Sequence, residues 1–334
     1  MMRIAQVSTV STLVREDASG SVEAWLWLLT RELTRLGHQV TVFATAGSET
    51  EGELVATLPG PYGAGGSPDD WHLCEWINLC RAVEQSHRFD VLHTHAYLWG
   101  LPLEPFSRAP LVHTLHIIPD ANAARLWSAR PQAHVTAISK HQWSAYPQLR
   151  PERVIPHGVD VSRFSFCPEP EDYVCYLGRF VSGKGPCQAI AAARALGLRL
   201  LLAGPPGPYF REKVQPLVDG KAVEYVGFVT GAARDKLLGG AKALLYPIQY
   251  PEPFGLVLIE AMLCGTPVAA INLGAVPEIV DEGVTGCTAD SPAQFSQAVV
   301  KCLSLDRRTV RQQAERRFSA EQMARAYAQM YALL

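Results

Sequence analysis

A glycine-rich segment with two cations is the clearest candidate for chemistry: Gly178-Arg179-Phe180-Val181-Ser182-Gly183-Lys184-Gly185. It follows an apolar run of strand length and precedes a stretch at 186–193 that we expect to be helical. Backbone N–H groups of glycines can approach an anion, a helix N-terminus carries partial positive charge, and Arg179 and Lys184 add two full charges. The segment therefore predicts a diphosphate-binding site.

The same segment matches the P-loop pattern G-x-x-x-x-G-K. A P-loop needs Ser or Thr after the lysine to hold magnesium, and Gly185 stands there instead. No acidic strand that would complete a magnesium site follows at the usual place. We therefore favour a diphosphate site without a metal ion, with a plain turn and solvated charges as the alternative.

Two glutamates, Glu252 and Glu260, flank a turn at Pro253–Gly255 and the start of an apolar predicted helix. A carboxylate in such a helix is costly unless it forms bonds, and the vicinal hydroxyls of a ribose would satisfy Glu260. Glu252 stands before the helix, near its exposed N–H groups, where a sugar hydroxyl or developing charge could be held. Capping or salt-bridge roles for both glutamates are the alternative.

The two glutamates could also be the acid and base of a glycoside hydrolase. If the segment were wholly helical, their separation would be about 12 Å, whereas hydrolase carboxyl pairs lie roughly 5–9.5 Å apart. The turn at Pro253 leaves the distance open, and no feature of the sequence supports hydrolysis, so we do not favour it.

Apolar runs of strand length alternate with segments of helical period along the chain. The expected strands are Ile4–Val7, Val40–Ala44, Val91–His93, Leu111–Leu115, Val135–Ile138, Val154–Ile155, Tyr173–Leu177, Arg199–Ala203, Val223–Val226, Ala243–Pro247 and Pro267–Ile271. The expected helices cover 22–36, 186–193, a segment from Leu256, and 320–334. This alternation predicts an α/β fold of two doubly wound domains with parallel sheets.

The length of 334 residues favours two domains. The irregular, proline-containing segment Gly158–Asp172 reads as a linker. We therefore predict an N-terminal domain over 1–158, a second domain over 159–316, and a C-terminal helix over 317–334 that packs back toward the first domain.

Composition excludes several classes of protein. Hydrophobic residues make up 48% of the chain and the net charge is -2, so neither disorder nor nucleic-acid or anionic-membrane binding is favoured. The eight cysteines form no C-x-x-C pair, which argues against a disulfide-stapled secreted protein. With no signal sequence and no apolar span, we expect a cytoplasmic protein.

Several segments, in order, resemble the GT4 family of retaining glycosyltransferases. Glu252 through Glu260 looks like the family's E-x7-E motif, and Gly178-Arg179 with Lys184-Gly185 is similar to its phosphate segment. Further matches are His157-Gly158-Val159-Asp160, Gly227-Phe228-Val229 and Gly274-Ala275-Val276-Pro277-Glu278. The resemblance covers nearly the whole chain and implies the GT-B fold, in which two Rossmann-like domains face a central cleft.

The resemblance also implies a nucleotide-sugar donor bound by the second domain. Arg179 and Lys184 would contact its diphosphate, Glu260 its ribose, and Val229 would lie near the base. A UDP-sugar such as UDP-glucose is favoured and GDP-mannose comes next. The nucleotide sugar is a co-substrate, so no cofactor is expected.

Near the transferred sugar and distal phosphate, the resemblance places Glu252 with the backbone of Phe254, Gly255 and Leu256. The family retains the anomeric configuration; we expect same-face attack, with the departing phosphate accepting the proton of the acceptor hydroxyl. Fixed cations and helix N-termini can stabilise that leaving group without a metal, which fits the lack of a D-x-D-like cluster.

In the first domain, the family's glycine-rich loop corresponds to Gly20, with Ser21 in place of the usual second glycine. The family histidine corresponds to His116, which would hydrogen-bond to sugar or phosphate. His93 and His95 lie at one predicted strand end and His113 and His116 at another, so four imidazoles could cluster. No Cys, Asp or Glu stands at ligand spacing beside them, so we do not favour a metal site there. An acceptor-side or structural role for His93 and His95 stays open.

The acceptor is expected to be a soluble sugar or small metabolite, with Trp71 or Trp99 as a stacking face. The helix at 22–36 carries only Arg31 and Arg35 as cations, and the loop Pro59–Asp70 ends in two aspartates, so membrane association is not expected. Two other functions remain alternatives: a non-hydrolysing sugar-nucleotide epimerase and a catalytically silent binding protein.

Overall fold

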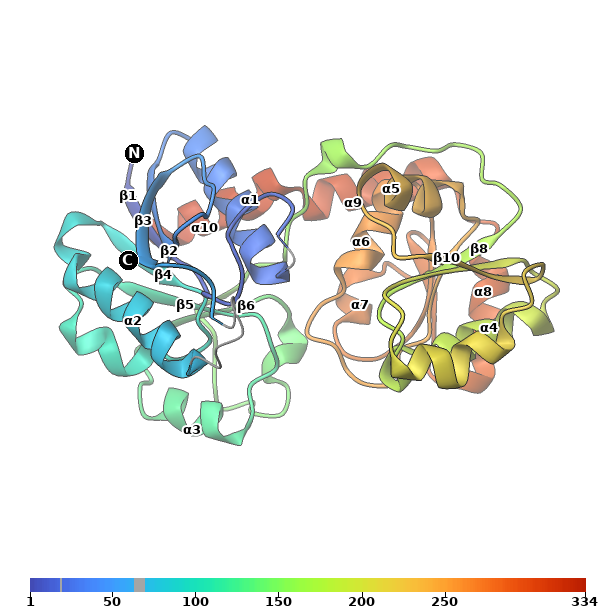
Figure 1. Cartoon of the computed structure of the whole chain (residues 1–334), viewed down its shortest axis with the longest axis horizontal. Coiled ribbons are helices and arrows are strands. Elements are labelled where there is room, and N and C mark those ends of the chain that lie inside the picture. Colours follow the sequence, from blue (N-terminus) through green and yellow to red (C-terminus); the bar gives the residue numbers. More distant parts are fainter. Residues whose placement is uncertain (19, 63–69) are drawn as a thin grey trace. The chain divides into compact units, whose positions relative to one another are not determined.

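The computed structural model describes residues 1–18, 20–62 and 70–334. The chain divides into two units: the first comprises Met1–Gly158 and Ala320–Leu334, and the second comprises Val159–Ser319. Each unit is a parallel sheet with helices on its faces (Figure 1). The predicted fold class of two doubly wound α/β domains is confirmed.

The first unit is built on a seven-stranded sheet in the order β3-β2-β1-β4-β5-β6-β7, with every pair of neighbours parallel. Its strands are β1 (Arg3–Val7), β2 (Gln39–Thr45), β3 (Glu53–Leu58), β4 (Val91–Thr94), β5 (Leu111–Leu115), β6 (His134–Ala137) and β7 (Arg153–Val154). Its helices are α1 (Ser21–Arg35), α2 (Trp71–Glu84), α3 (Ala121–Ser128) and, from the end of the chain, α10 (Ala320–Tyr331).

Two apolar layers enclose this sheet. Because successive side chains of a strand point to opposite faces, Ile4 of β1 joins the cluster with Leu29 of α1 and Tyr327 of α10. Its neighbour Ala5 joins the other cluster, with Leu79 of α2. Helices α1 and α10 therefore cover one face of the sheet and α2 covers the other.

The second unit has a six-stranded parallel sheet in the order β10-β9-β8-β11-β12-β13. Its strands are β8 (Val174–Leu177), β9 (Leu200–Ala203), β10 (Val223–Gly227), β11 (Leu244–Tyr246), β12 (Val268–Ile271) and β13 (Gly286–Ala289). Its helices are α4 (Pro186–Ala195), α5 (Gly231–Gly240), α6 (Leu256–Leu263), α7 (Val276–Ile279), α8 (Phe295–Cys302) and α9 (Arg307–Phe318).

Each sheet has a point where the strand order reverses, between β1 and β4 in the first unit and between β8 and β11 in the second. Open α/β sheets bind ligands outside the carboxyl ends of their strands at such a point. In the second unit the segments that leave β8 and β11 begin at Gly178 and Pro247. The two motifs singled out in the sequence thus follow the two strands that flank the reversal.

The end of the chain belongs to the first unit. The second unit ends at Ser319 rather than at residue 316, and α10 follows. The residues predicted to share one side of this helix are all buried: Met323, Tyr327, Met330 and Tyr331.

The segment predicted as a linker is fixed to the second unit. Ser165 N–H donates to Asp235 Oδ1 at 2.8 Å, and Cys167 N–H donates to the Cys264 carbonyl at 3.1 Å. These bonds satisfy the backbone of an otherwise irregular stretch. The prediction of irregular structure holds, but the segment is an integral part of the second unit.

A buried guanidinium braces the same region. Arg307 of α9 donates to the carbonyls of Cys167, Gly239 and Ala241, at 2.6–2.8 Å, and to Thr266 Oγ1 at 2.9 Å. Burial lowers its pKa. One side chain therefore satisfies carbonyls from two separate segments of the second unit.

In the described part of the chain, no helix is long and apolar enough to cross a membrane. All eight cysteines are free thiols.

Candidate functional site

Glu252 lies where the second sheet reverses its strand order, in the segment after β11. Its carboxylate accepts hydrogen bonds from Lys184 Nζ and from the hydroxyls of Tyr246 and Tyr250. Only 7% of the residue is exposed. A buried carboxylate needs charged or polar partners of this kind, and the lysine of the predicted phosphate segment supplies the balancing charge.

Two glycines allow the phosphate segment to reach this carboxylate. A Cβ on Gly183 would lie 2.4 Å from the ring of Tyr250, and one on Gly185, whose φ is +70°, would lie 2.0 Å from the Pro247 carbonyl oxygen. Gln249 N–H donates to the Gly183 carbonyl at 2.7 Å. The glycines therefore let the two segments pack closely, with Lys184 directed at Glu252.

A third segment closes on Glu252 from the end of β12. Ala275 N–H donates to the Glu252 carbonyl at 3.0 Å. Gly274 has φ +61°, and a Cβ there would lie 2.3 Å from the Glu252 nitrogen. Loops that follow three neighbouring strands thus meet at this glutamate.

Glu260, in the second turn of α6, forms an ion pair with Arg234 of α5. Burial raises the pKa of Glu260, and the charge of Arg234 opposes that rise. We predicted that this carboxylate needs a partner, and within the chain Arg234 is that partner. Within the chain, both Glu252 and Glu260 form salt bridges, as the alternative interpretation of these glutamates predicted.

The remaining donor-site candidates of the second unit lie at the carboxyl edge of the same sheet. Arg179 follows β8, is exposed, and makes no ion pair with any described residue. Val229 is half-buried after β10. Gly255 is the N-cap of α6, Leu256 begins the helix, and Phe254 is buried before it. The first-turn N–H groups of a helix have no intrahelical acceptor.

Gly20 has a structural role within the first unit. A Cβ there would lie 2.0 Å from Glu23 Oε2. The buried Glu23 carboxylate accepts hydrogen bonds from Thr9 Oγ1 at 2.8 Å, from the Ser11 hydroxyl and from Thr12 N–H at 3.2 Å. A glycine is therefore needed for Glu23 to fold back over the loop, and an approach of Gly20 to a phosphate stays a prediction.

Another carboxyl group fastens the same loop from α2. Glu75 Oε1 accepts a hydrogen bond from Val10 N–H at 3.1 Å, whereas Oε2 has no hydrogen-bond partner among the described residues. Burial raises the pKa of Glu75 from 4.5 to about 7. Ionisation of this carboxyl group therefore destabilises the folded state.

Replacing Glu75 with glutamine is expected to stabilise the first unit at neutral pH. Between pH 4.5 and 7 the unfolded chain loses this proton while the folded chain keeps it, so stability falls as pH rises through that window. The amide Oε1 still accepts from Val10 N–H. Urea unfolding should show a gain of about 3 kcal/mol at pH 8 and almost none at pH 4. An equal gain in stability at both pH values would show that ionisation of Glu75 is not what destabilises the folded state.

His116 lies just after β5 in a buried group of aromatic rings. Its Nε2 is 3.1 Å from Nδ1 of His95, and its ring centroid is 4.9 Å from that of Trp25 and 5.3 Å from that of His157. Burial lowers the pKa of His116 to about 3, so the imidazole is neutral. The predicted catalytic histidine is thus a fixed, uncharged hydrogen-bonding group.

The four histidines considered for a metal site do not gather at one point. His93 and His95 lie beside His116, whereas His113 points to the other face of the sheet, where its Nε2 is 3.1 Å from Glu104 Oε1. Within residues 1–18, 20–62 and 70–334, no group of three or more His, Cys, Asp or Glu side chains is arranged to hold a metal ion.

Two family models match this chain in succession. "Glycosyltransferase Family 4" matches residues 22–163 and "Glycosyl transferases group 1" matches residues 161–318. The chain belongs to the family 4, group 1 glycosyltransferases. The resemblance inferred from the sequence motifs is confirmed.

Curated relatives of this glycosyltransferase include two named D-inositol 3-phosphate glycosyltransferase. The protein of Mycolicibacterium smegmatis is 27% identical, over 81% of this chain and 75% of its own length. That of Corynebacterium efficiens is 26% identical, over 93% of this chain and 89% of its own length.

Solved structures confirm the predicted GT-B fold. Sucrose-phosphate synthase of Thermosynechococcus elongatus superposes with a TM-score of 0.79 at 21% identity, covering 100% of this chain and 99% of that one. AviGT4, a glycosyltransferase involved in avilamycin A biosynthesis, gives 0.72 at 26% identity, covering 100% and 98%. HepE of Anabaena, in complex with UDP and glucose, gives 0.73 at 20% identity, covering 100% of both chains.

On the predicted acceptor side of the glycosyltransferase, aromatic rings lie together. Trp71 begins α2, is 43% exposed and stacks on His72 at 3.6 Å. The ring of Trp99, which follows β4, lies 6.2 Å from that of Trp71. The two tryptophans proposed as stacking faces are therefore neighbours. Residues 63–69 of the loop Pro59–Asp70 lie outside the described residues.

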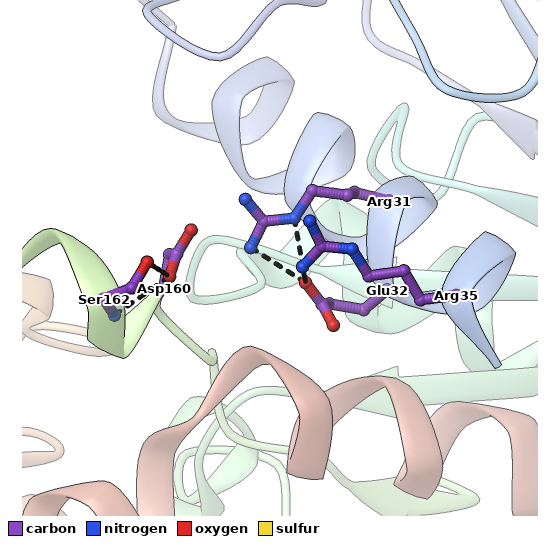
Figure 2. A network of polar contacts seen from close by, with 5 residues as sticks. All are labelled: Arg31, Glu32, Arg35, Asp160 and Ser162. Carbon is purple, nitrogen blue, oxygen red and sulfur yellow. Dashed lines mark hydrogen bonds and ion pairs between the residues drawn. The ribbon is translucent and has the colours of Figure 1, made fainter.

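The cations of α1 are balanced by a carboxylate on the same helix. Figure 2 shows Glu32 Oε1 bonded to Arg31 Nε at 2.8 Å and to Arg35 Nη1 at 3.1 Å. The same figure shows Asp160 Oδ1 accepting from the Ser162 hydroxyl at 2.6 Å, in the second unit. The two arginines thus form no unbalanced basic face on α1.

Sequence reasoning missed the side chains that hold the motif residues. Arg234, Tyr246 and Tyr250 were not singled out. Tyr250 was the easiest of these to infer from the sequence, since it stands two positions before Glu252 and a hydroxyl can donate a hydrogen bond to a carboxylate. Arg234 precedes Glu260 by 26 positions, with a strand between them, and no sequence pattern connects the two.

Proposed function

We propose that this glycosyltransferase moves a hexosyl group from a nucleotide-diphosphate sugar to a hydroxyl of a small soluble acceptor, with retention of configuration. The observation that carries the proposal is the placement of Lys184 on Glu252 at the strand-order reversal of the second unit, with Arg179 exposed beside the same strand end. This is where an open α/β sheet binds a nucleotide.

The departure of a nucleoside diphosphate builds negative charge on phosphate oxygens. Lys184, Arg179 and the first-turn N–H groups of α6 would stabilise that charge, since fixed donors and cations are most effective where charge develops. We propose that these groups suffice without a divalent ion. The departing phosphate would accept the proton of the acceptor hydroxyl, which attacks from the same face.

The two glutamates would hold the hydroxyl groups of the donor. Glu252, where loops from three strands come together, would meet the transferred sugar, and Glu260 would bind the ribose hydroxyls with Arg234 as its counter-ion. We favour a UDP-sugar because HepE of Anabaena was solved with UDP and glucose and with UDP-glucose. GDP-mannose is the second choice.

The acceptor side supports a soluble small molecule. The curated relatives are named for D-inositol 3-phosphate, a phosphorylated polyol. Trp71 and Trp99 offer apolar ring faces of the kind on which a sugar or polyol stacks. The pairing of Arg31 and Arg35 with Glu32 leaves no basic helix face on α1 for anionic lipid.

A donor screen tests the proposal. Thermal unfolding is measured with UDP, GDP, ADP and dTDP and with their sugars; a ligand at a hundred times its Kd should stabilise the chain by about 2.7 kcal/mol. Glu260→Gln should weaken binding of the preferred nucleotide about tenfold, because the charged acceptor of the ribose hydroxyls becomes a neutral amide. The exposed Glu212→Gln is the matched control.

Turnover separates the remaining possibilities. Transfer to a soluble acceptor that persists in excess chelator supports the proposal. Transfer only to a lipid embedded in vesicles would overturn the soluble acceptor. Loss of turnover on chelation would overturn the mechanism without a divalent ion, and binding without any transfer would overturn the enzymatic function.

A further inference from the structure

Polar side chains form a row across one face of the first sheet. Gln6 of β1, His93 of β4, Thr114 of β5 and Thr136 of β6 are all fully buried. Gln6 pairs in register with His93, and Thr114 with Thr136, so neighbouring members lie side by side. They lie on the face covered by α10, which adds the buried Tyr331.

Hydrogen bonds join this row from one end to the other. Thr136 Oγ1 lies 3.3 Å from the His113 carbonyl oxygen and 2.6 Å from Thr114 Oγ1. Thr114 Oγ1 is 2.6 Å from His93 Nε2, and His93 Nδ1 is 2.6 Å from the Tyr331 hydroxyl. Each of these groups therefore contacts the next.

From Tyr331 the row continues through Gln6 and His95 to His116. Gln6 Nε2 is 3.3 Å from the Tyr331 hydroxyl, and Gln6 Oε1 is 2.8 Å from His95 Nε2. His95 Nδ1 is in turn 3.1 Å from His116 Nε2. One chain of hydrogen bonds thus connects the carbonyl of His113 with the ring of His116.

The direction of these bonds follows from the end of the row at the His113 carbonyl, which can only accept. A carbonyl oxygen only accepts, so Thr136 gives it its single proton and must accept from Thr114. Thr114 has then given its single proton to Thr136, so it accepts from His93 Nε2–H. A neutral imidazole has only one N–H, so His93 Nδ1 accepts from the Tyr331 hydroxyl.

The Gln6 amide carries the same direction on to His95, because the Tyr331 hydroxyl has given its proton to His93 and must accept from Gln6. Its NH2 group only donates and its oxygen only accepts. Tyr331 therefore accepts from Gln6, and His95 must carry its proton on Nε2. His95 Nδ1 is then an acceptor, and the proton of His116 lies on Nε2.

This order determines what His116 can offer a ligand. With Nε2–H used by His95, Nδ1 of the neutral ring carries a lone pair, and it has no hydrogen-bond partner among the described residues. Burial lowers the pKa of His93, His95 and His116, so a doubly protonated ring that would donate from both nitrogens is disfavoured at each position.

We propose that Nδ1 of His116 accepts a hydrogen bond from a substrate hydroxyl and does not donate one to phosphate, and that Gln6 and Tyr331 are positioning residues that hold this tautomer. The inference rests on the proposed function, because it takes the substrate to be a sugar or polyol at the end of β5. It chooses between the sugar and phosphate contacts that the family resemblance left open.

The tautomer is measurable without substrate. Long-range proton–nitrogen correlation spectra of protein labelled with [15N]histidine distinguish a protonated from a bare ring nitrogen, and His116→Asn identifies the signals of that ring. The expected spectrum has Nε2 of His116 protonated and Nδ1 bare. The opposite pattern overturns the proposal, whatever the activity.

Gln6→Met removes the acceptor of His95 Nε2–H. A buried N–H without a partner is costly, so His95 should move its proton to Nδ1 and donate it to His116, which then becomes protonated on Nδ1. We expect the spectrum to reverse and kcat with UDP-glucose to fall about tenfold, with little change in the Kd for UDP. A reversed spectrum with unchanged kcat overturns the hydroxyl contact.

Two tyrosines of α10 provide a matched pair. Tyr331→Phe removes the acceptor of the Gln6 NH2 group, so the amide can turn over and present its NH2 group to His95, and His95 and His116 should then populate both tautomers. Tyr327→Phe also removes a buried tyrosine hydroxyl, one that contacts Thr114 at 3.1 Å and also Thr136 but neither His95 nor Gln6, and it should change neither spectrum nor kcat. If the His116 tautomer is as assigned but no nucleotide sugar is turned over, the assignment stands and the proposed function is overturned.

Discussion

Lys184→Met is expected to lower kcat/KM for sugar transfer by about 10²–10³, the cost of removing one fixed donor from a developing oxyanion. Lys184 is the cation that the phosphate segment directs at Glu252, and its side chain is only 18% exposed. Methionine keeps most of the side-chain volume and removes the charge. Initial rates over a range of donor concentrations measure the effect.

The same change leaves the buried Glu252 carboxylate with two tyrosine hydroxyls and no counter-ion, which also destabilises the second unit. Adding Glu252→Gln to Lys184→Met removes the unpaired charge, so stability should recover while turnover does not. Lys213→Met, in an exposed ion pair with Glu212, is the control. Recovery of turnover in the double variant would show that Lys184 only neutralises Glu252.

Arg307→Met is expected to destabilise the second unit by about 3–5 kcal/mol, because four hydrogen bonds from a charged donor to buried acceptors are lost together. The substitution leaves the carbonyls of Cys167, Gly239 and Ala241 without their guanidinium donor. Each lost bond to a buried acceptor carries a desolvation penalty.

The distribution of tryptophan makes this prediction specific. All seven tryptophans lie before residue 144, in the first unit, so tryptophan fluorescence follows that unit and far-UV circular dichroism follows both. In urea, the Arg307 variant should shift the dichroism transition and leave the fluorescence transition in place. The neighbouring exposed Arg308→Met is the control. A shift of both transitions together would show that the units unfold as one.

Strands buried on both faces were predictable because continuous apolar runs have few other structures available. The strands β3 and β13 were not predicted. β3 is a partly exposed edge strand with a mixed pattern. β13 begins at Gly286, which reads as a strand breaker, yet a Cβ there would lie 2.2 Å from the Val268 carbonyl oxygen of β12.

The motif residues were predictable for a related reason. In a parallel sheet all carboxyl ends lie at one edge, so segments that follow strands meet there whatever their separation in the sequence. Which segments become neighbours depends on strand order, which no local pattern contains. The contacts of Glu260 with Arg234, and of Gln6 with Tyr331, depend on that order and on how the helices pack on the sheets.

The first unit is built from both ends of the chain, with α10 following the whole of the second unit. During synthesis on the ribosome, residues 1–158 therefore emerge long before the helix that buries the face around Tyr327. The contiguous second unit can complete its core first. A nascent chain stopped before residue 320 would expose the apolar face of the first sheet to chaperones and proteases.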